Sequence, residues 1–310
     1  MLDPYAQSIL VFLGINAIAA YSFYLPFKTG QVSLGQAGFM AVGAYAAGIV
    51  TVKWGLPFPL GLLFGGAIAG IVGVGVGFPA LRIKGIYLLL LTLAFGEIIQ
   101  VIILSWEYVG GGAGFQGLPF TPGVLVYTYA ILALVLMFCA RLERSSLGRA
   151  MDAIHEDETA AEVMGVDVVR IKLLAFGLGA FLAGLAGALF AHFATYVDSV
   201  TFGILISVEI LVFVLVGGGF SFWGPLVGAT FLTLLPEGLR AVRGTLEWIP
   251  SEWVSGPTAT RLYDALYNFL DFENEKRLIV YGLILIAMMI ARPQGLVTRE
   301  LVRLLFGRRK

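Results

Sequence analysis

Four side chains that could carry chemistry lie inside long apolar stretches of the sequence. They are Glu97, Gln100, His192 and Glu209. A charge near the middle of a bilayer costs about 2.5 to 3.5 kcal/mol on insertion scales, so such groups usually face a cavity or a partner. Each of the four is therefore a candidate either for lining a pathway or for a hydrogen bond that holds neighbouring helices together.

Sequence motifs of enzymes are incomplete in this chain. His155 and Glu156 begin like the zinc motif HExxH, but Thr159 occupies the position of the second histidine. Ser33 lies between glycines without the GxSxG spacing of a hydrolase nucleophile. The glycine-rich stretch 217–224 lacks the Lys-Ser/Thr pair of a phosphate-binding loop. The sequence therefore predicts no catalytic residue and no metal site.

The composition is that of a protein embedded in a membrane. Hydrophobic residues make up 59% of the chain, charged residues 13%, and the mean hydropathy is +0.91. Soluble domains have roughly 45 to 50% apolar and about 25% charged residues. The single cysteine, Cys139, excludes an internal disulfide, and the formal net charge of zero gives no indication of nucleic-acid binding. We predict one all-α polytopic membrane domain over residues 1–310.

About nine transmembrane helices are expected, within a range of eight to ten, from apolar runs long enough to cross a bilayer. Their predicted positions are 5–26, 32–52, 57–79, 85–106, 122–140, 172–195, 200–217, 222–240 and 278–292. This arrangement puts fourteen of the twenty Lys and Arg residues on one side of the membrane and six on the other. Because cytoplasmic loops carry an excess of Lys and Arg, we expect the N-terminus outside and the basic tail 293–310 in the cytoplasm.

A predicted external segment, about 245–277, contains an amphipathic helix. Its apolar residues recur at helical spacing and are Leu262, Ala265, Leu266, Phe269 and Leu270. Tryptophan and tyrosine residues nearby are typical of a membrane interface. The segment is expected either to pack at that interface or to serve as a docking surface for an external partner.

A strongly charged cytoplasmic loop, about 141–171, contrasts with the apolar runs around it. The stretch 149–172 holds nine of the forty formally charged residues. Its pattern predicts two short helices and not a loose loop. The first carries an apolar stripe at helical spacing, formed by Leu147, Ala150, Met151 and Ile154.

The second short helix has a start signal and a stop signal. Asp157 is placed to cap a helix that begins at Glu158, whose charge suits the positive end of the helix dipole. Gly165 stands where a glycine commonly ends a helix. Between these signals the expected apolar face is formed by Ala160, Ala161 and Met164. Such a small helix, held at the cytoplasmic surface, is suited to binding a soluble partner.

This loop resembles the coupling helix of the permease subunits of ABC importers. Their loop motif is commonly EAA, three residues, then Gly. Here the corresponding residues are Thr159, Ala160 and Ala161, then Gly165, so the leading Glu is absent and Glu158 lies one position early. The resemblance assigns contact with an ATPase to Asp157, Glu158, Ala160, Ala161, Met164 and Gly165.

The flanking sequences are similar to branched-chain amino acid permeases of the LivM type. The similar stretches are GQVSLGQAGFMAVGAYAAGIV at 30–50, GIYLLLLTLAFGEIIQ at 85–100, KLLAFGLGAFLAGLAGALFA at 172–191 and VEILVFVLVGGGFSFWGPLVGA at 208–229. The resemblance implies an inner-membrane importer of leucine, isoleucine or valine, with a second related permease and an external substrate-binding protein. ATP and Mg²⁺ would bind partner ATPase subunits, and this chain would bind no cofactor.

Other functions stay open at the level of the sequence. Residues 245–277 do not match the LivM pattern, and related permeases carry urea, amides or other amino acids. A stand-alone secondary transporter or channel is the alternative of another class, with Glu97 or Glu209 relaying protons or cations.

Overall fold

The chain is an all-helical membrane protein in the computed structural model, which describes residues 3–83, 85–119, 121, 123–246, 282, 283, 286, 290 and 295–297. Within these ranges there is no β-strand, only an isolated antiparallel bridge between Phe115 and Val197. Six of the described helical segments are long and apolar enough to cross a membrane. The predicted class of all-α polytopic membrane protein is therefore confirmed.

The long helices follow the predicted spans. They are α1 (Pro4–Phe27), α2 (Gln36–Gly48), α3 (Phe58–Ala80), α4 (Ile86–Ser105), α5 (Val124–Arg144), α8 (Val168–Ala194), α9 (Ile204–Gly217) and α10 (Gly224–Leu246). The loop between α5 and α8 forms α6 (Ser146–Glu156) and α7 (Glu158–Val163). Shorter elements are the π-helical η1 (Ile49–Lys53) and the 3-10 turns η2 (Glu107–Val109), η3 (Gly111–Ala113) and η4 (Val200–Phe202).

Two predicted segments fall mostly or wholly beyond the described residues. Of the ninth span, 278–292, only residues 282, 283, 286 and 290 are described. The external segment 245–277 is described only at its first two residues, which end α10, and the tail 293–310 only at residues 295–297.

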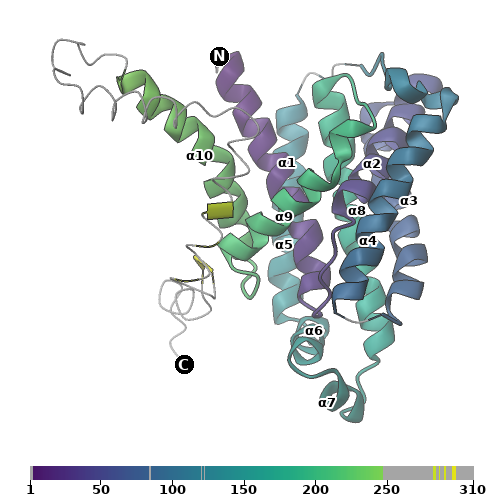
Figure 1. The fold of residues 1–310 in the computed structure, drawn as a ribbon, viewed down its shortest axis with the longest axis vertical. Helices are drawn as coiled ribbons and strands as arrows, with labels where there is room; N and C mark the ends of the chain where they lie inside the picture. The colour runs from purple at the N-terminus through teal and green to yellow at the C-terminus, as the bar shows by residue number, and fades with distance from the viewer. Residues whose placement is uncertain are drawn as a thin grey trace, which may run out of the picture.

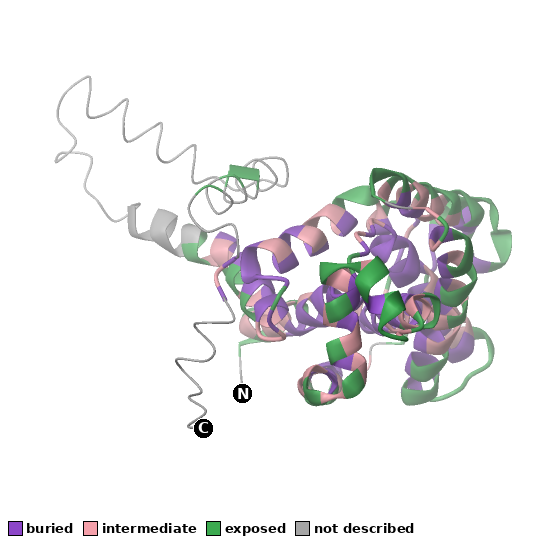
Figure 2. Ribbon diagram, turned by 90° about the horizontal axis from the view of Figure 1, so that it is seen from below, coloured by how far each residue is buried: buried purple, intermediate pink, exposed green. Residues whose placement is uncertain are grey.

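The centre of the bundle is α8, which packs against α1, α2 and α3. Small residues allow the close approach. A Cβ atom added to Gly43 of α2 would lie 2.2 Å from the carbonyl oxygen of Gly184, and one added to Gly187 would lie 1.9 Å from that of Met40. Because lipid gives no hydrophobic drive between helices, such backbone contacts are a common way to pack them. Figure 2 shows the buried residues gathered along the inner helices and the exposed ones on the outer helices.

The second predicted span is only partly helical, which corrects the sequence-based expectation. A helix was expected from residue 32, but α2 begins at Gln36, and the segment 28–35 before it lacks helical structure apart from a turn at its start. Hydroxyl groups accept from two amides at the junction between this segment and α2. The amide of Leu34 donates to Thr92 Oγ1 at 2.9 Å, and that of Ala37 donates to Ser207 Oγ at 3.0 Å. Non-helical backbone at membrane depth is tolerated only where the protein or a water-filled cavity satisfies its polar groups.

The two ends of the bundle differ. The short helices α6 and α7 form one end, and the start of α1 lies at the other (Figure 1). Helix α10 leans away from the remaining helices, and its contacts are with α1 and α9. The loop that the sequence singled out is therefore a distinct structural feature at one end of the molecule.

Candidate functional site

Helix α6 is held against the bundle by its apolar stripe. Ser145 caps its start, with the side-chain oxygen accepting a hydrogen bond from the amide of Gly148 at 3.1 Å. Met151 and Ile154 are fully buried, at 0% and 2% exposure. The sequence-based prediction of a helix with this stripe is confirmed, and the stripe faces the protein itself.

Helix α7 is short and is fixed by signals at both ends. Asp157 Oδ1 accepts hydrogen bonds from the amides of Thr159 at 2.8 Å and Ala160 at 3.1 Å. At the other end Gly165 has a φ of +84°, and two further bonds follow. The amide of Gly165 donates to Glu162 O at 2.9 Å, and that of Val166 donates to Ala161 O at 3.1 Å. This pair of bonds is a Schellman motif, which favours glycine at its left-handed position.

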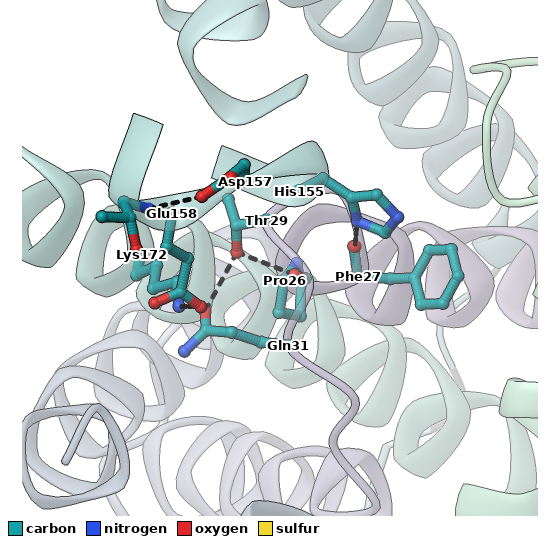
Figure 3. A network of polar contacts seen from close by, with 9 residues as sticks. Pro26, Phe27, Thr29, Gln31, His155, Asp157, Glu158 and Lys172 are labelled. Atoms are coloured by element: carbon teal, nitrogen blue, oxygen red, sulfur yellow. Dashed lines mark hydrogen bonds and ion pairs between the residues drawn. The ribbon is translucent and has the colours of Figure 1, made fainter. Parts of the chain in front are cut away.

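Three polar contacts tie these short helices to the membrane helices. The Lys28 ammonium, directly after α1, pairs with Asp152 of α6 at 3.5 Å, and its side chain is only 4% exposed. Figure 3 shows the other two: His155 Nδ1 lies 3.0 Å from the carbonyl oxygen of Phe27, and Lys172 of α8 pairs with Glu158 of α7. Helices α6 and α7 are therefore bonded directly to the end of α1 and to the first turns of α8.

The outward face of α7 differs from the one expected. Ala161 was predicted to share an apolar face with Ala160 and Met164, but it is buried against its own chain at 4% exposure. Val163 and Met164 are each 83% exposed, and Ala160 is exposed beside them. The sequence-based prediction was wrong here because a six-residue helix makes fewer than two turns, so its residue spacing does not define which side faces inward. The solvent-exposed apolar group is therefore Ala160, Val163 and Met164.

His192 is buried between helices and has partners for both ring nitrogens. Its Nδ1 lies 2.9 Å from the carbonyl oxygen of Ala188, and its Nε2 lies 2.9 Å from Thr51 Oγ1. A carbonyl oxygen can only accept, so Nδ1 carries a proton. Nε2 is within hydrogen-bond distance of the Thr51 hydroxyl, which also donates to the carbonyl oxygen of Ala47 at 3.0 Å. This geometry joins α8 to η1 and is typical of a histidine with a structural role.

Glu209 lines a cavity of about 140 Å³ between α1, α2, α8, η4 and α9. Most of the lining is apolar, with Phe190, Phe202 and Phe213 among its residues. The other polar residue in the lining is Asn16, whose amide donates to Thr233 Oγ1 of α10 at 3.0 Å. Asn16 was not singled out in the sequence, although an amide in the middle of an apolar run was the available signal.

Glu97 and Gln100 have different surroundings from His192 and Glu209. Both belong to α4, where Glu97 is exposed and Gln100 is half-buried. A Cβ added to Gly203, just before α9, would lie 3.5 Å from the Gln100 side-chain nitrogen. The four intramembrane candidates therefore do not form one cluster. Within the described residues no group of three or more His, Cys, Asp or Glu side chains could hold a metal ion.

The bundle of long apolar helices, with a capped and anchored two-helix loop at one end, defines the class of the chain as a polytopic membrane protein. Residues 5–289 match the family described as branched-chain amino acid transport system, permease component. The chain belongs to this family, which confirms the resemblance drawn from its sequence.

The individual relatives are also permeases. The chain is 30% identical to the high-affinity branched-chain amino acid transport system permease protein LivM of Salmonella typhimurium strain LT2, and 31% identical to that of Escherichia coli strain K12. Each match covers 97% of this chain and 71% of the relative. The fructose import permease protein FrcC of Rhizobium meliloti is 25% identical over 77% of this chain and 72% of its own length. No solved structure matches the chain.

Proposed function

We propose that this chain is the membrane-spanning permease subunit of an ATP-driven importer of the branched-chain amino acids leucine, isoleucine and valine. The observation that carries the proposal is the similarity to two LivM proteins along 97% of the chain. The fructose permease is less similar and matches a shorter part, 77% of the chain. Urea, amides and other amino acids are the alternative substrates within the same family.

In the proposed mechanism the exposed group Ala160, Val163 and Met164 binds a groove on a separate ATPase subunit. That subunit binds ATP and Mg²⁺, and this chain catalyses no reaction and binds no cofactor. Closure of the ATPase pair moves α6 and α7. The contacts at Lys28, His155 and Lys172 pass the movement to α1 and α8. The bundle then alternates between outward and inward openings.

The proposed topology has nine spans, with the N-terminus outside and the α6–α7 end in the cytoplasm. Basic residues support this orientation, because Lys28 follows α1 at that end and the last turn of α5 carries Arg141 and Arg144. An excess of Lys and Arg is typical of cytoplasmic loops. The segment 245–277 then lies outside, together with an external substrate-binding protein.

The direct test is leucine uptake by the purified complex in proteoliposomes, with the binding protein and ATP supplied on their proper sides. We expect uptake that requires ATP and is inhibited by excess isoleucine or valine but not by urea or amides. Inhibition by urea or an amide, with no effect of valine, would assign the permease to another substrate.

A further inference from the structure

A stripe of exposed residues runs the length of α4 and includes a carboxylate near its middle. The stripe consists of Leu90, Ala94, Glu97, Val101 and Leu104, which are all exposed. Their spacing alternates between four and three residues, so they lie on one line along the helix. Glu97 is the twelfth of the twenty residues of α4, which places it deep inside the bilayer.

The opposite side of α4 is already attached to the bundle. Thr92 is buried and receives the hydrogen bond from the amide of Leu34. A Cβ added to Gly38 of α2 would lie 2.9 Å from the Cα of Gly96, so the two backbones are in close contact there. Helix α4 is therefore fixed in rotation, and the stripe cannot turn inward to hide Glu97.

Lipid is an unsuitable neighbour for this stripe. A charge at the bilayer centre is costly, and intramembrane carboxylates almost always face a bundle interior or a water-filled space. Other exposed faces of the protein are apolar at comparable depth. Ile71 of α3 is 72% exposed and Leu134 of α5 is 59% exposed, and such side chains are well suited to lipid.

We propose that the stripe on α4 is the surface on which the second permease subunit packs, with Glu97 facing the seam between the two subunits. This inference rests on the proposed function, because the resemblance to LivM permeases implies a second related permease in the same importer. Because the stripe is a straight line along α4, a second helix can pack beside it over most of its length. Ala94, one turn before Glu97, allows a close approach, and Glu97 receives hydrogen bonds from groups that face it across the seam.

Photo-crosslinking in the purified complex tests the inference, with an epitope tag on the second permease subunit. A benzophenone side chain is placed at Leu90 or Val101 on the stripe, and at Ile71 on α3 as the matched control. We expect an adduct that carries the tag from positions 90 and 101 and none from position 71. Adducts only with lipid, or only with a second copy of this chain, would overturn the proposal.

Substitution of Glu97 gives an independent readout of the same surface. Glu97→Gln keeps a hydrogen-bonding group, whereas Glu97→Leu removes it and makes the stripe fully apolar. Since a hydrogen bond between membrane helices stabilises by a modest amount, we expect Glu97→Leu to lower recovery of the second permease by about three- to tenfold, and Glu97→Gln to lower it less. Equal or improved recovery with Glu97→Leu would show that the stripe faces lipid.

The two proposals fail separately in these experiments. ATP-dependent leucine uptake by the unmodified complex, without the tagged adducts, would refute the seam and leave the function intact. Tagged adducts from a complex that shows no ATP-dependent uptake would refute the function and leave the seam intact.

Discussion

Gly165 is the residue whose conformation most directly controls the shape of the cytoplasmic loop. Its φ of +84° lies in the left-handed region, and a Cβ added there would meet nothing within 4 Å. The cost of Gly165→Val is therefore conformational, about 1 to 2 kcal/mol or more for a β-branched residue. We expect normal membrane insertion but a severalfold loss of substrate-stimulated ATP hydrolysis in the reconstituted complex. Gly165→Asn is the control, because asparagine tolerates this conformation, and equal activity in both variants would contradict the account.

Met164 tests docking without disturbing the fold of the loop. It is 83% exposed, so Met164→Asp leaves no charge buried in this chain. An apolar anchor at an interface typically contributes about 2 kcal/mol or more, so ATPase binding in a pull-down should weaken roughly thirtyfold. Glu162→Gln, at an exposed position on the same helix, should change little. Full ATPase binding by Met164→Asp would exclude this face as the docking surface.

Individual residues of the loop could be predicted where their roles are local. The cap at Asp157 and the stop at Gly165 depend only on neighbouring residues, and both are as expected. The burial of Ala161 and the pairing of Lys28 with Asp152 depend on how α6 and α7 rest on the bundle. That placement is set by tertiary packing, so it could not be predicted from the local sequence.

The start of α2 is held by groups that are distant from it in the sequence. Thr92 lies six residues after the start of α4, which is about 9 Å along the helix axis, and it satisfies the amide of Leu34. Thr92→Val keeps the shape of the side chain but leaves the Leu34 amide without its partner, which should lower the free energy of unfolding by about 1 to 3 kcal/mol. We expect the apparent melting temperature of the purified complex to fall, while Thr92→Ser stays close to the wild type. Equal melting temperatures for the wild type, Thr92→Val and Thr92→Ser would show that the Thr92 hydroxyl does not stabilise the start of α2.

Hydropathy predicted the helices correctly where the whole of an apolar run is helical. Helices α1, α3 and α4 match their predicted ranges to within a residue or two at each end. The error at residues 32–35 arises because hydropathy measures side chains and not backbone hydrogen bonds. The hydroxyls of Thr92 and Ser207 bind the amides of Leu34, just before α2, and of Ala37, in its first turn, and they are 58 and 170 residues away from those amides.

The orientation of the chain in the membrane is a property of the whole molecule. Trp54, between α2 and α3, is 57% exposed, and Arg149 of α6 is exposed at the loop that we assign to the cytoplasm. In a Cys139→Ser background, a cysteine at position 54 should react with an impermeant thiol reagent in intact cells. A cysteine at position 149 should react only after the cells are opened. The reverse pattern would invert the proposed topology.

The intramembrane carboxylates separate an ATP-driven permease from a secondary carrier. Because such groups need a partner or a neutral form, Glu97→Gln and Glu209→Gln should reduce uptake without abolishing it, and uptake should not depend on a proton gradient in any variant. Conversion of uptake from gradient-driven to uncoupled by either change would favour the secondary carrier. Uptake by proteoliposomes with and without an imposed pH gradient is the measurement.

At the scale of the whole molecule the sequence was most informative about class and family. Composition alone predicted a membrane protein, and the stretches at 30–50 and 208–229 carried the resemblance that the family match confirms. The grouping of polar residues in space was not predictable. Glu97, His192 and Glu209 look alike in a hydropathy profile, yet one is exposed, one is fully hydrogen-bonded between helices and one lines a cavity.

The central claim is that this chain transports branched-chain amino acids only when a partner hydrolyses ATP. The most direct measurement is uptake of labelled leucine into proteoliposomes that contain the complete complex, compared with a complex whose ATPase binds ATP but cannot hydrolyse it. We predict leucine accumulation with the active ATPase and only background uptake with the inactive one, at equal amounts of assembled permease. Equal accumulation by the two complexes would contradict the account.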